Sequence, residues 1–446
     1  MRRLQDQYAA IPPGAPVRLA KRTSNLFRQR AETGIAGLDV RAFDGVLEVD
    51  PQTRTADVQG MTTYEHLVAA TLPYGLMPLV VPQLKTITLG GAVTGLGIES
   101  TSFRHGLPHE SVLEAEVLTG DGRVVLATPT GEHADLYHGL PNSYGTLGYV
   151  LRLRIELQQT RPFVALRHLS FTDLGAASAA IARIGADREY QGRSVDFLDG
   201  TAFSPAEIVL TLGEFVDEAP YGVSDYTGRH IYYRSLRERH TDTLTVHDYL
   251  WRWDTDWFWC SGAFGVQNRF VRPLLPRRLL RSDTYWKVMA LEAKHGLYAR
   301  YESWRGRPER ERVIQDIEVP LSRLSEYLTW FDREIGMRPV WLCPLLPRDP
   351  GTRWPLYEMS HDEPWVNVGF WGTVPLGPGQ SDGHHNRLVE AEVERLGGRK
   401  SLYSSAFYEP DEFWRLYNGA AYRALKDAYD PQRRLLDLYD KAVRAR

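Results

Sequence analysis

The sequence predicts an α+β fold built from more than one domain. In the first 160 residues the strand-like segments come as hairpins, at 45–61 and 112–129, and not in alternation with long helices, which argues against a doubly wound parallel sheet. From about residue 160 the composition changes and a second series of strands and helices begins. The length of 446 residues also exceeds that of one ordinary hydrophobic core. We therefore expect a first domain over 1–160, a second over 161–400 and a helical C-terminal segment over 401–446.

The elements of the first domain are short. Leu67, Val68 and Leu72 recur at helical spacing between a Thr cap and Gly75, so residues 62–76 predict a helix. Strands are expected at 16–22, in the two hairpins at 45–61 and 112–129, and at the end of 133–158, after a short helix and a glycine turn.

The second domain alternates strands with a few helices. Strands are expected at 164–171, 194–203, 206–216, 338–346 and 365–374, and helices at 173–185 and, after a short strand, within 316–336. An Arg-rich helical stretch extends to about residue 311. The segment from Asp411 onward predicts helices with a break at Asp430-Pro431.

Composition excludes several classes of protein. The chain is 43% hydrophobic and 24% charged with a formal net charge of −3, which gives no electrostatic footprint for DNA or RNA. Cys260 and Cys343 lie far apart and form no CxxC pair, so we expect neither a disulfide framework nor a metal site. We find no signal peptide and no segment approaching the ~18–20 apolar residues of a membrane-spanning helix. These features predict a cytoplasmic location. Only 7 of the 53 Lys and Arg residues are Lys, a bias that suggests a GC-rich bacterial genome.

Residues 86–101, TITLGGAVTGLGIEST, form the most distinctive stretch. A dinucleotide-binding fingerprint would need a third glycine at Ser100, after Gly95 and Gly97, and a P-loop would need Lys at Leu96, so neither motif is present. Glycines let successive N–H groups converge on an anion, and the hydroxyl run that follows adds donors. The stretch alone leaves two interpretations open: an anion-binding turn, or a glycine-rich turn without a ligand.

Glycine motifs around this stretch favour the first interpretation. Pro82 precedes Thr88-Leu89-Gly90-Gly91, and His105-Gly106, Gly120-Asp121-Gly122 and Gly145-Thr146-Leu147-Gly148-Tyr149 follow in order. This series resembles the PCMH-type FAD-binding domain of the vanillyl-alcohol-oxidase flavoproteins, and Asp430-Pro431 resembles the ending of that family. The resemblance implies two α+β subdomains that hold FAD, an α+β cap domain for the substrate, and a C-terminal segment that returns to the FAD-binding domain. The first subdomain would be shortened, because the sequence begins about twenty residues before the loop KRTSN.

In that family the Gly-Gly loop holds the FAD pyrophosphate and the later GTLG turn approaches the isoalloxazine. The residues that the resemblance implies in cofactor binding are Arg22, Thr23, Ser24, Asn25, Thr88, Leu89, Gly90, Gly91, Gly95, Gly97, Ile98, Glu99, Ser100, Ser102, His105, Gly106, Leu107, Gly145, Thr146, Leu147, Gly148 and Tyr149. Because an anion repels a carboxylate, we expect Glu99 to face ribityl or ribose hydroxyls or to turn outward. Many relatives tether FAD through His or Cys in the first loop, but residues 21–28 contain neither. We expect noncovalent FAD, with attachment through His105 as the alternative.

A narrower resemblance extends over almost the whole chain. Segments 96–107, 143–156, 315–324, 339–346 and 412–422 are similar to the Δ24-sterol reductases, the seladin-like branch. That branch includes bacterial FAD-linked reductases that act on methylene-bearing fatty acyl chains in branched-chain lipid synthesis. The sequence does not show the hydrophobic N-terminal anchor of the sterol enzymes, which together with its bacterial composition favours the acyl-lipid branch.

The resemblance thus implies an FAD-dependent oxidoreductase acting on CH–CH groups, first of all a 10-methylene to 10-methyl reductase of fatty acyl lipids that uses hydride from NADPH. The alternatives are a Δ24-sterol-type side-chain reductase and an FAD-dependent oxidase or dehydrogenase of a polyol, sugar or hydroxy acid. A non-catalytic lipid- or flavin-binding protein is a further class. Because no nicotinamide motif is present, NADPH or NADH would be a transient donor. The expected partners are the lipid substrate, at a membrane surface, and a companion lipid methyltransferase, which adds a peripheral position on the inner face of the cell membrane to the cytoplasmic expectation.

Saturation of an isolated double bond needs a strong acid near the flavin, because no carbonyl group is present to polarise. Candidates on the second domain are Tyr249, His247, Arg252 and Glu318, with Asp248 and Asp316 beside them. Each can equally be a hydrogen-bonded structural group, since grouped polar side chains mark sites only statistically.

The aromatic segment around residue 255 carries two interpretations. Trp251, Trp253, Trp257 and Trp259 predict either the aromatic core of the second domain or an apolar wall for a long substrate. After it, Arg and Leu interleave over 272–281, which suits a segment that lies on anionic lipid. The pair His384-His385 follows a polar glycine-rich loop without a third ligand nearby, so we expect solvated side chains and no metal.

Overall fold

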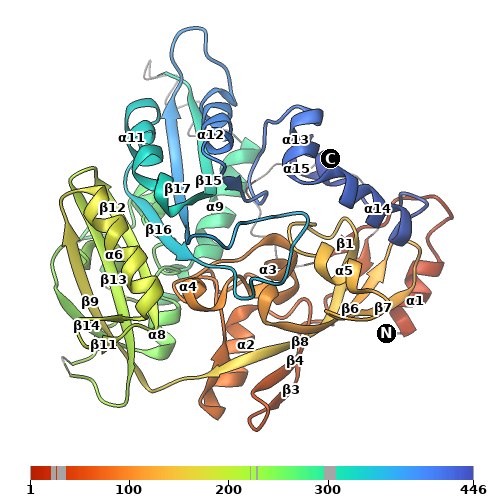
Figure 1. Ribbon diagram of the computed structural model, residues 1–446, viewed down its shortest axis with the longest axis horizontal. Coiled ribbons are helices and arrows are strands. Elements are labelled where there is room, and N and C mark those ends of the chain that lie inside the picture. The colour runs from red at the N-terminus through yellow and green to blue at the C-terminus, as the bar shows by residue number, and fades with distance from the viewer. Residues whose placement is uncertain are drawn as a thin grey trace.

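The computed structural model describes residues 2–21, 27, 37–220, 222–227, 230–295 and 308–444. Two large antiparallel sheets organise these residues, and Figure 1 shows the first at lower right and the second at the left and top. The first sheet ends with a strand at Gln159 and the second begins with a strand at Phe163. The predicted α+β class is confirmed. Arg22, Thr23, Ser24 and Asn25 lie outside the described residues.

The first sheet has the strand order β3-β4-β8-β6-β7, and β5 pairs with β8 beside this path. Its strands are β3 (Val46–Asp50), β4 (Thr55–Gln59), β5 (Leu76–Pro78), β6 (Val112–Thr119), β7 (Val124–Ala127) and β8 (Gly148–Gln159). The two predicted hairpins are β3 with β4 and β6 with β7. The predicted strand at 16–22 is limited to β1 (Leu19–Ala20), which pairs in parallel with β2 (Leu38–Asp39).

Short helices accompany this sheet. They are α1 (Arg2–Ala9), α2 (Tyr64–Thr71), α3 (Leu89–Gly95), α4 (Ser102–His105) and α5 (Ala134–Gly139), with 3₁₀ turns at Leu72–Tyr74 and Pro108–Ser111. Helix α2 begins at the predicted Thr cap, where the Thr63 side chain accepts a hydrogen bond from the N–H of His66. A left-handed Gly75 follows the turn after α2, as expected from the sequence.

The second sheet comprises, among the described residues, eight strands in the order β14-β9-β13-β12-β16-β17-β15-β18. They are β9 (Phe163–Phe171), β12 (Phe197–Ser204), β13 (Glu207–Val216), β14 (Thr241–Thr245), β15 (Arg310–Pro320), β16 (Val340–Leu345), β17 (Trp365–Pro375) and β18 (Arg399–Lys400), and a separate hairpin joins β10 (Glu189–Tyr190) to β11 (Arg193–Ser194). The strands predicted near 164, 194, 206, 338 and 365 are therefore present.

Helices of the second domain pack against one face of this sheet. They are α6 (Leu174–Asp187), α11 (Leu324–Glu334) and α12 (His384–Arg395), and their apolar side chains share a core cluster with alternate residues of β15, β16 and β17. Other helices are α7 (Tyr232–Ser235), α8 (Val246–Leu250) and α9 (Ser282–His295), with 3₁₀ turns at Cys260–Phe264, Arg272–Leu274, Arg277–Leu279 and Leu321–Arg323. Of the Arg-rich stretch expected to be helical up to about residue 311, Ser282–His295 is helix α9, and the residues before it contain 3₁₀ turns. Residues 296–307 lie outside the described residues, and β15 begins at Arg310.

The opposite face of the second sheet packs toward the first domain. Leu153 of β8 and Trp341 of β16 belong to one hydrophobic cluster, which also includes Tyr422 of the C-terminal segment. That segment contains α13 (Pro410–Leu416), α14 (Gly419–Tyr429) and α15 (Leu438–Ala442), and it is interrupted after Tyr429 as the sequence predicts. The three parts of the chain thus contribute to one shared apolar cluster.

Candidate functional site

A cavity of about 520 Å³ lies where the two sheets and the C-terminal segment meet. Helix α3 and the turn at 144–150 line it from the first domain, and β15, β16 and β17 line it from the second. The C-terminal segment adds Ser401, Tyr403, Leu436 and Lys441. Every part of the chain therefore contributes to this one cavity.

The glycine-rich stretch enters the cavity as a helix, so the expected turn is wrong. Thr88 caps α3, and its hydroxyl accepts a hydrogen bond from Gly91 N–H at 3.2 Å. The next donors are occupied too, because the N–H of Leu89 bonds to Thr62 O and that of Gly90 to Gly60 O, both at 2.9 Å. These N–H groups are thus engaged within the protein and do not converge freely on an anion.

The glycines of α3 permit close packing. A Cβ on Gly90 would lie 2.8 Å from the carbonyl oxygen of Gly60, so a larger residue would push the helix away from the end of β4. Gly91 is exposed and lines the cavity. At Gly90, Gly91 and Gly95 helix α3 therefore exposes its backbone directly to the cavity, without intervening side chains.

The residues predicted to bind the cofactor divide into three groups. Those that line the cavity are Thr88, Gly90, Gly91, Gly95, Gly97, Ile98, Gly145, Gly148 and Tyr149. Those that do not line it are Leu89, Glu99, Ser100, Ser102, His105, Gly106, Leu107, Thr146 and Leu147. The remaining four, Arg22 to Asn25, are outside the described residues.

Several unanticipated polar residues line the cavity. Arg18, Lys21 and Lys441 bring positive charge to it. The buried Nε of Arg18, the Nε2 of Gln83 and the Oδ1 of Asn367 lack a hydrogen-bond partner within the protein. Unpartnered buried polar atoms are rare in folded proteins. Two donors and one acceptor therefore remain for a polar ligand.

Two carboxyl groups project into the cavity from β15. Asp316 and Glu318 are two positions apart and so share one face of the strand. Burial raises the pKa of Glu318 to about 8, although the Tyr357 hydroxyl donates a hydrogen bond to its Oε2. Burial also raises the pKa of Asp316 to about 6, while Asn367 Nδ2 donates to Asp316 Oδ1 at 3.0 Å. Glu318 therefore holds a proton at neutral pH.

A glycine leaves room for these carboxyl groups. Gly369 of β17 lies opposite Asp316 in the β-ladder, and Asn367 lies opposite Glu318. A Cβ on Gly369 would lie 2.5 Å from Asp316 Oδ1. Because Gly369 has no side chain, the Asp316 carboxyl and the ring of Trp371 can both lie close to its backbone.

Aromatic rings form another wall of the cavity. Trp257, Phe258, Trp341 and Trp371 line it, and the rings of Phe258 and Trp371 stack with centroids 4.3 Å apart. Trp251 and Trp253 are fully buried and do not line the cavity. Of the four tryptophans of the aromatic segment, Trp257 alone therefore lines the cavity, and Trp251 and Trp253 belong to the hydrophobic core.

The other predicted catalytic residues lie away from the cavity. Arg252 is buried between Glu99 Oε1 and Asp199 Oδ2, at 2.9 Å from each. Tyr249 is buried and shares a 2.9 Å hydrogen bond with the hydroxyl of Ser100. His247 is exposed and bonds to Asp248 Oδ1. None of these three lines the cavity, and of the four candidates only Glu318 does.

Glu99 behaves differently from the expectation. Its carboxylate neither turns outward nor lines the cavity, because it is buried and ion-paired with Arg252. The N–H of Ser100 also donates to its Oε1 at 2.7 Å. Burial raises the pKa of Glu99, and the guanidinium of Arg252 opposes that rise. The Glu99 carboxylate, which an anion would repel, therefore forms an ion pair that joins the first domain to the second.

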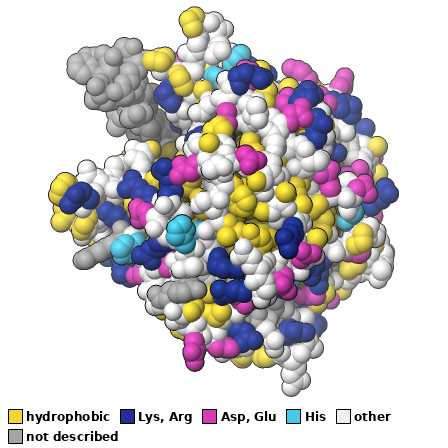
Figure 2. Space-filling view, turned by 60° about the vertical axis from the view of Figure 1, so that its left-hand side comes forward, with side chains coloured by type: hydrophobic (Ala, Val, Ile, Leu, Met, Phe, Trp, Pro, Cys, Tyr) yellow, Lys and Arg dark blue, Asp and Glu magenta, His cyan; other side chains and the backbone are white. Residues whose placement is uncertain are grey.

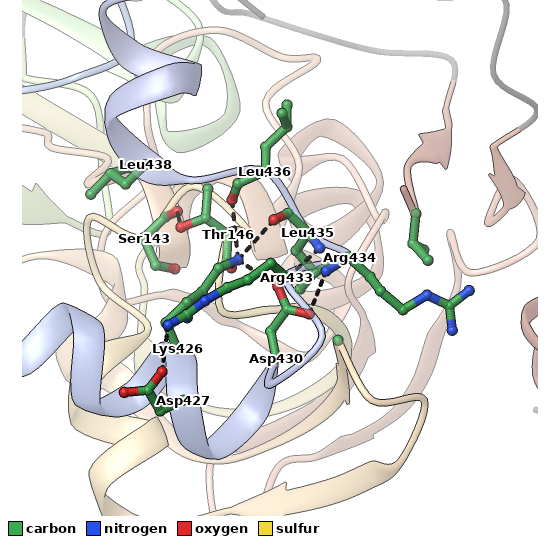
Figure 3. Close-up of polar contacts among 12 residues, drawn as sticks. Ser143, Thr146, Lys426, Asp427, Asp430, Arg433, Arg434, Leu435, Leu436 and Leu438 are labelled. Atoms are coloured by element: carbon green, nitrogen blue, oxygen red, sulfur yellow. Dashed lines mark hydrogen bonds and ion pairs between the residues drawn. The ribbon is translucent and has the colours of Figure 1, made fainter. Parts of the chain in front are cut away.

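The C-terminal segment fixes the turn that follows α5. Figure 3 shows the Lys426 side chain pointing toward Thr146 and toward the backbone of Leu435 and Leu436. Its ammonium donates to Thr146 O at 2.7 Å and to Leu435 O at 2.9 Å, and it is ion-paired with Asp430 at 2.6 Å. Asp430 in turn accepts from the N–H groups of Arg434 and Leu435. Thr146 and Asp430 therefore act as structural anchors behind the cavity.

Three further features of the described residues concern metal binding, His385 and membrane spanning. Among the described residues no group of three or more His, Cys, Asp or Glu side chains is arranged to hold a metal ion. His385 is not solvated as expected, because it is buried against Glu311 at 2.8 Å. Within the described ranges, no helix has the length and apolar character needed to cross a bilayer.

Comparison with known proteins matches residues 9–128 to the family model of an FAD binding domain. The chain carries an FAD-binding domain. Human Δ24-sterol reductase is 27% identical over 416 residues, which cover 90% of this chain and 76% of the human protein. The Arabidopsis thaliana Δ24-sterol reductase is 24% identical over 443 residues, covering 92% of this chain and 77% of the plant protein. Decaprenylphosphoryl-β-D-ribose oxidase of Mycolicibacterium smegmatis is 33% identical over 130 residues, 28% of this chain and 27% of that protein. This chain is an FAD-dependent oxidoreductase.

The cavity residues fit FAD. The three cations Arg18, Lys21 and Lys441 suit a dianionic pyrophosphate, and the bare backbone of α3 allows close approach. The unpartnered Gln83 Nε2 and Asn367 Oδ1 supply a donor and an acceptor for a flavin or its ribityl chain. His105 does not line the cavity and bonds to Gln158 instead. The sequence missed Arg18 and Gln83 because no motif surrounds them.

Proposed function

We propose that this flavoprotein reduces an isolated carbon–carbon double bond in a lipid. The observation that carries the proposal is Glu318, a carboxyl group whose pKa burial raises to about 8, in a cavity lined both by residues that fit FAD and by aromatic rings. Reduction of an alkene needs one hydride and one proton, delivered to neighbouring carbons. FAD, when bound, supplies the hydride.

Glu318 is the proposed proton donor. Tyr357 donates to Oε2 of its carboxyl group, which leaves Oε1 to carry the acidic proton toward the substrate. The raised pKa keeps that proton in place near pH 7, where an ordinary carboxyl group would have lost it. Asp316 and Asn367 lie next to Glu318 and line the same cavity.

The aromatic wall supports an apolar substrate. Trp257, Phe258, Trp341 and Trp371 offer ring faces, which pack against hydrocarbon and also stabilise positive charge that develops on an alkene carbon during protonation. A polyol or sugar would leave its hydroxyl groups unpaired against these rings. The lining thus favours the double-bond reductase over the polyol oxidase.

The comparisons favour a sterol-type side chain as the substrate over the methylene-branched acyl chain expected from the sequence. Both human and plant relatives matched over about nine tenths of this chain are named Δ24-sterol reductases. The methylene-branched acyl chain, for which a companion methyltransferase would supply the methylene group, is the second substrate. NADPH or NADH is proposed as a transient donor, and the location as cytoplasmic or peripheral on the inner membrane face.

The test is an anaerobic assay of the purified full-length protein loaded with FAD. NADPH should bleach the flavin absorbance, and a lipid with a side-chain double bond should restore it and gain two hydrogens by mass spectrometry. A sterol with a side-chain double bond and a methylene-branched phospholipid are compared directly. Bleaching by a polyol or hydroxy acid, with no response to NADPH and no alkene reduction, would contradict the proposal.

A further inference from the structure

A second cavity, of about 310 Å³, shares no lining residue with the first. It lies between the segment around α7 and residues 267–273, and the charged side chains that line it are mostly basic. They are His230, Arg234, Arg239, Arg269 and Arg272, against one acidic residue, Glu238. This concentration of arginine is not explained by the proposed reduction.

Two of these arginines are neutralised by the protein. Arg272 is buried and bonds to both carboxylate oxygens of Asp256, at 2.6 and 2.8 Å, and also donates to His230 O. Arg239 donates to Asp242 Oδ1 at 3.2 Å. These pairs build the frame of the cavity and add little net charge to it.

The other two arginines keep their charge available. Within the described residues neither Arg234 nor Arg269 has a carboxylate at ion-pair distance. Arg234 donates to Gln267 Oε1 at 2.7 Å, and the guanidinium of Arg269 lies 5.1 Å from the centre of the Phe270 ring. With Glu238 counted against them, the cavity retains a positive excess that suits a phosphate group.

The segment that supplies Arg269 also exposes large apolar side chains. Phe270 is 72% exposed and Leu274 is 82% exposed, with Val271 between them. The segment is not loose, because Gln267 Nε2 donates to Trp259 O and Ser261 Oγ, and Asn268 O accepts from the N–H groups of Val271 and Arg272. Apolar side chains held in water beside unpaired arginines are typical of surfaces that meet anionic lipid.

The same segment connects the two cavities along the chain. Trp257 and Phe258 line the first cavity, and a 3₁₀ turn, Cys260–Phe264, follows them. The side chains that line the second cavity come next, namely Gln267, Arg269, Arg272 and Pro273. Figure 2 shows one face of the molecule on which hydrophobic side chains gather near the centre among charged ones, so apolar surface is not confined to this segment. What distinguishes residues 267–275 is the combination of apolar side chains, unpaired arginine and a cavity.

We propose that the second cavity binds the phosphate of an anionic phospholipid headgroup at a membrane surface, while Phe270 and Leu274 enter the boundary of the acyl chains. The functional role of this membrane binding rests on the proposed function, in which a lipid substrate reaches the first cavity from the membrane. The binding itself depends only on the residues named here. Within the segment 272–281 expected at a lipid surface, Arg277 is ion-paired with Asp225 at 2.9 Å, whereas Arg269 lies just before that segment.

Vesicle flotation of the full-length protein tests the proposal without any turnover. Binding to vesicles of phosphatidylcholine with phosphatidylglycerol should exceed binding to phosphatidylcholine alone. The double variant Arg234→Gln with Arg269→Gln should lower partitioning to anionic vesicles by about 30-fold, at roughly a fivefold loss for each cation. Phe270→Ser with Leu274→Ser should lower it by about 100-fold, because two large side chains no longer insert. Glu238→Gln should raise it by about fivefold.

Leu47→Ser, at an exposed apolar residue of β3, and Arg183→Gln, at an exposed arginine of α6, are matched controls that should change nothing. Unchanged far-UV circular dichroism shows that each variant is folded. Equal binding by the wild type and the Phe270/Leu274 variant would overturn the proposal. So would binding of soluble glycerol phosphate, abolished by the arginine variant, without any vesicle binding. Failure of alkene reduction would leave these results unaffected.

Discussion

Two pairs of buried carboxyl groups lie near the boundary of the first and second domains, and the protein neutralises them differently. Glu99 and Asp199 share the guanidinium of Arg252 and do not line the main cavity. Asp316 and Glu318 line the cavity, and among the described residues the side chains that hydrogen-bond to their carboxyl groups, Asn367, Tyr357 and Tyr403, are neutral. A carboxyl pair that shares an arginine holds domains together, whereas a carboxyl group whose raised pKa favours its protonated form, as for Glu318, can give a proton away.

The largest expected effect comes from Glu318, the member of the cavity pair whose raised pKa favours the protonated form. In Glu318→Gln the amide keeps the size of the side chain but has no acidic proton to give, so turnover of the alkene should fall by about 100- to 10,000-fold. Flavin absorbance and thermal midpoint should remain close to those of the wild type. Single-turnover reoxidation of the reduced flavin by the alkene measures the effect, and a loss below tenfold would remove Glu318 as the donor.

The substitution Arg252→Met removes the cation shared by the other pair, Glu99 and Asp199. It leaves Glu99 and Asp199 buried without a cation, so the free energy of unfolding should fall by about 3–5 kcal/mol. Urea unfolding followed by tryptophan fluorescence measures this loss. Adding Glu99→Gln and Asp199→Asn should restore at least half of it. If Arg252→Met instead retained stability and abolished turnover, the contrast between the two pairs would be wrong.

Dependence on pH distinguishes the pairs further. The folded-state pKa of Glu318, about 8, exceeds its usual value, so its contribution to stability is fully present below the unfolded pKa and is lost as pH rises through about 8. Turnover should fall over the same range. Tyr357→Phe removes a donor that lowers this pKa, so the alkaline limb of the pH profile should move upward by roughly half to one pH unit. An unmoved limb would assign it to another group.

The smallest effect is expected at His247, a catalytic candidate from the sequence that, unlike the two carboxyl pairs, is exposed at the surface. Its side chain is exposed and bonds only to the neighbouring Asp248 among the described residues. His247→Ala should change the free energy of unfolding by no more than about 0.5 kcal/mol and leave turnover unchanged. A large kinetic loss would require a role for the surface near α8 that the cavity does not explain.

The local elements were largely predictable, and helix α3 was not. The hairpins β3–β4 and β6–β7 follow from alternation around polar or glycine turns. The sequence Leu89-Gly90-Gly91 disfavours a helix, since glycine is a poor helix former. Long-range contacts override that preference, because Gly90 packs on Gly60 and Thr88 caps the helix.

The glycines that line the cavity were predictable from the sequence, whereas the candidate proton donor was not singled out among four residues. Motif resemblance marked Gly90, Gly91, Gly95 and Gly97, which line the cavity. It could not show that Glu318 lines the cavity and that Arg252 does not, because the position of each side chain depends on partners distant in sequence. Arg252 meets Glu99 across 153 positions, and the face of β15 that carries Glu318 is set by its pairing with β17.

The contact between Lys426 and Thr146 joins residues 280 positions apart, and it has a consequence for the order of events during translation. Residues 18–150 emerge from the ribosome early, yet Tyr403, Leu436 and Lys441 must still arrive before the cavity is closed. A nascent chain therefore carries an open glycine surface until its final helices dock. Flavin capture should accordingly be a late step that follows docking of the C-terminal helices.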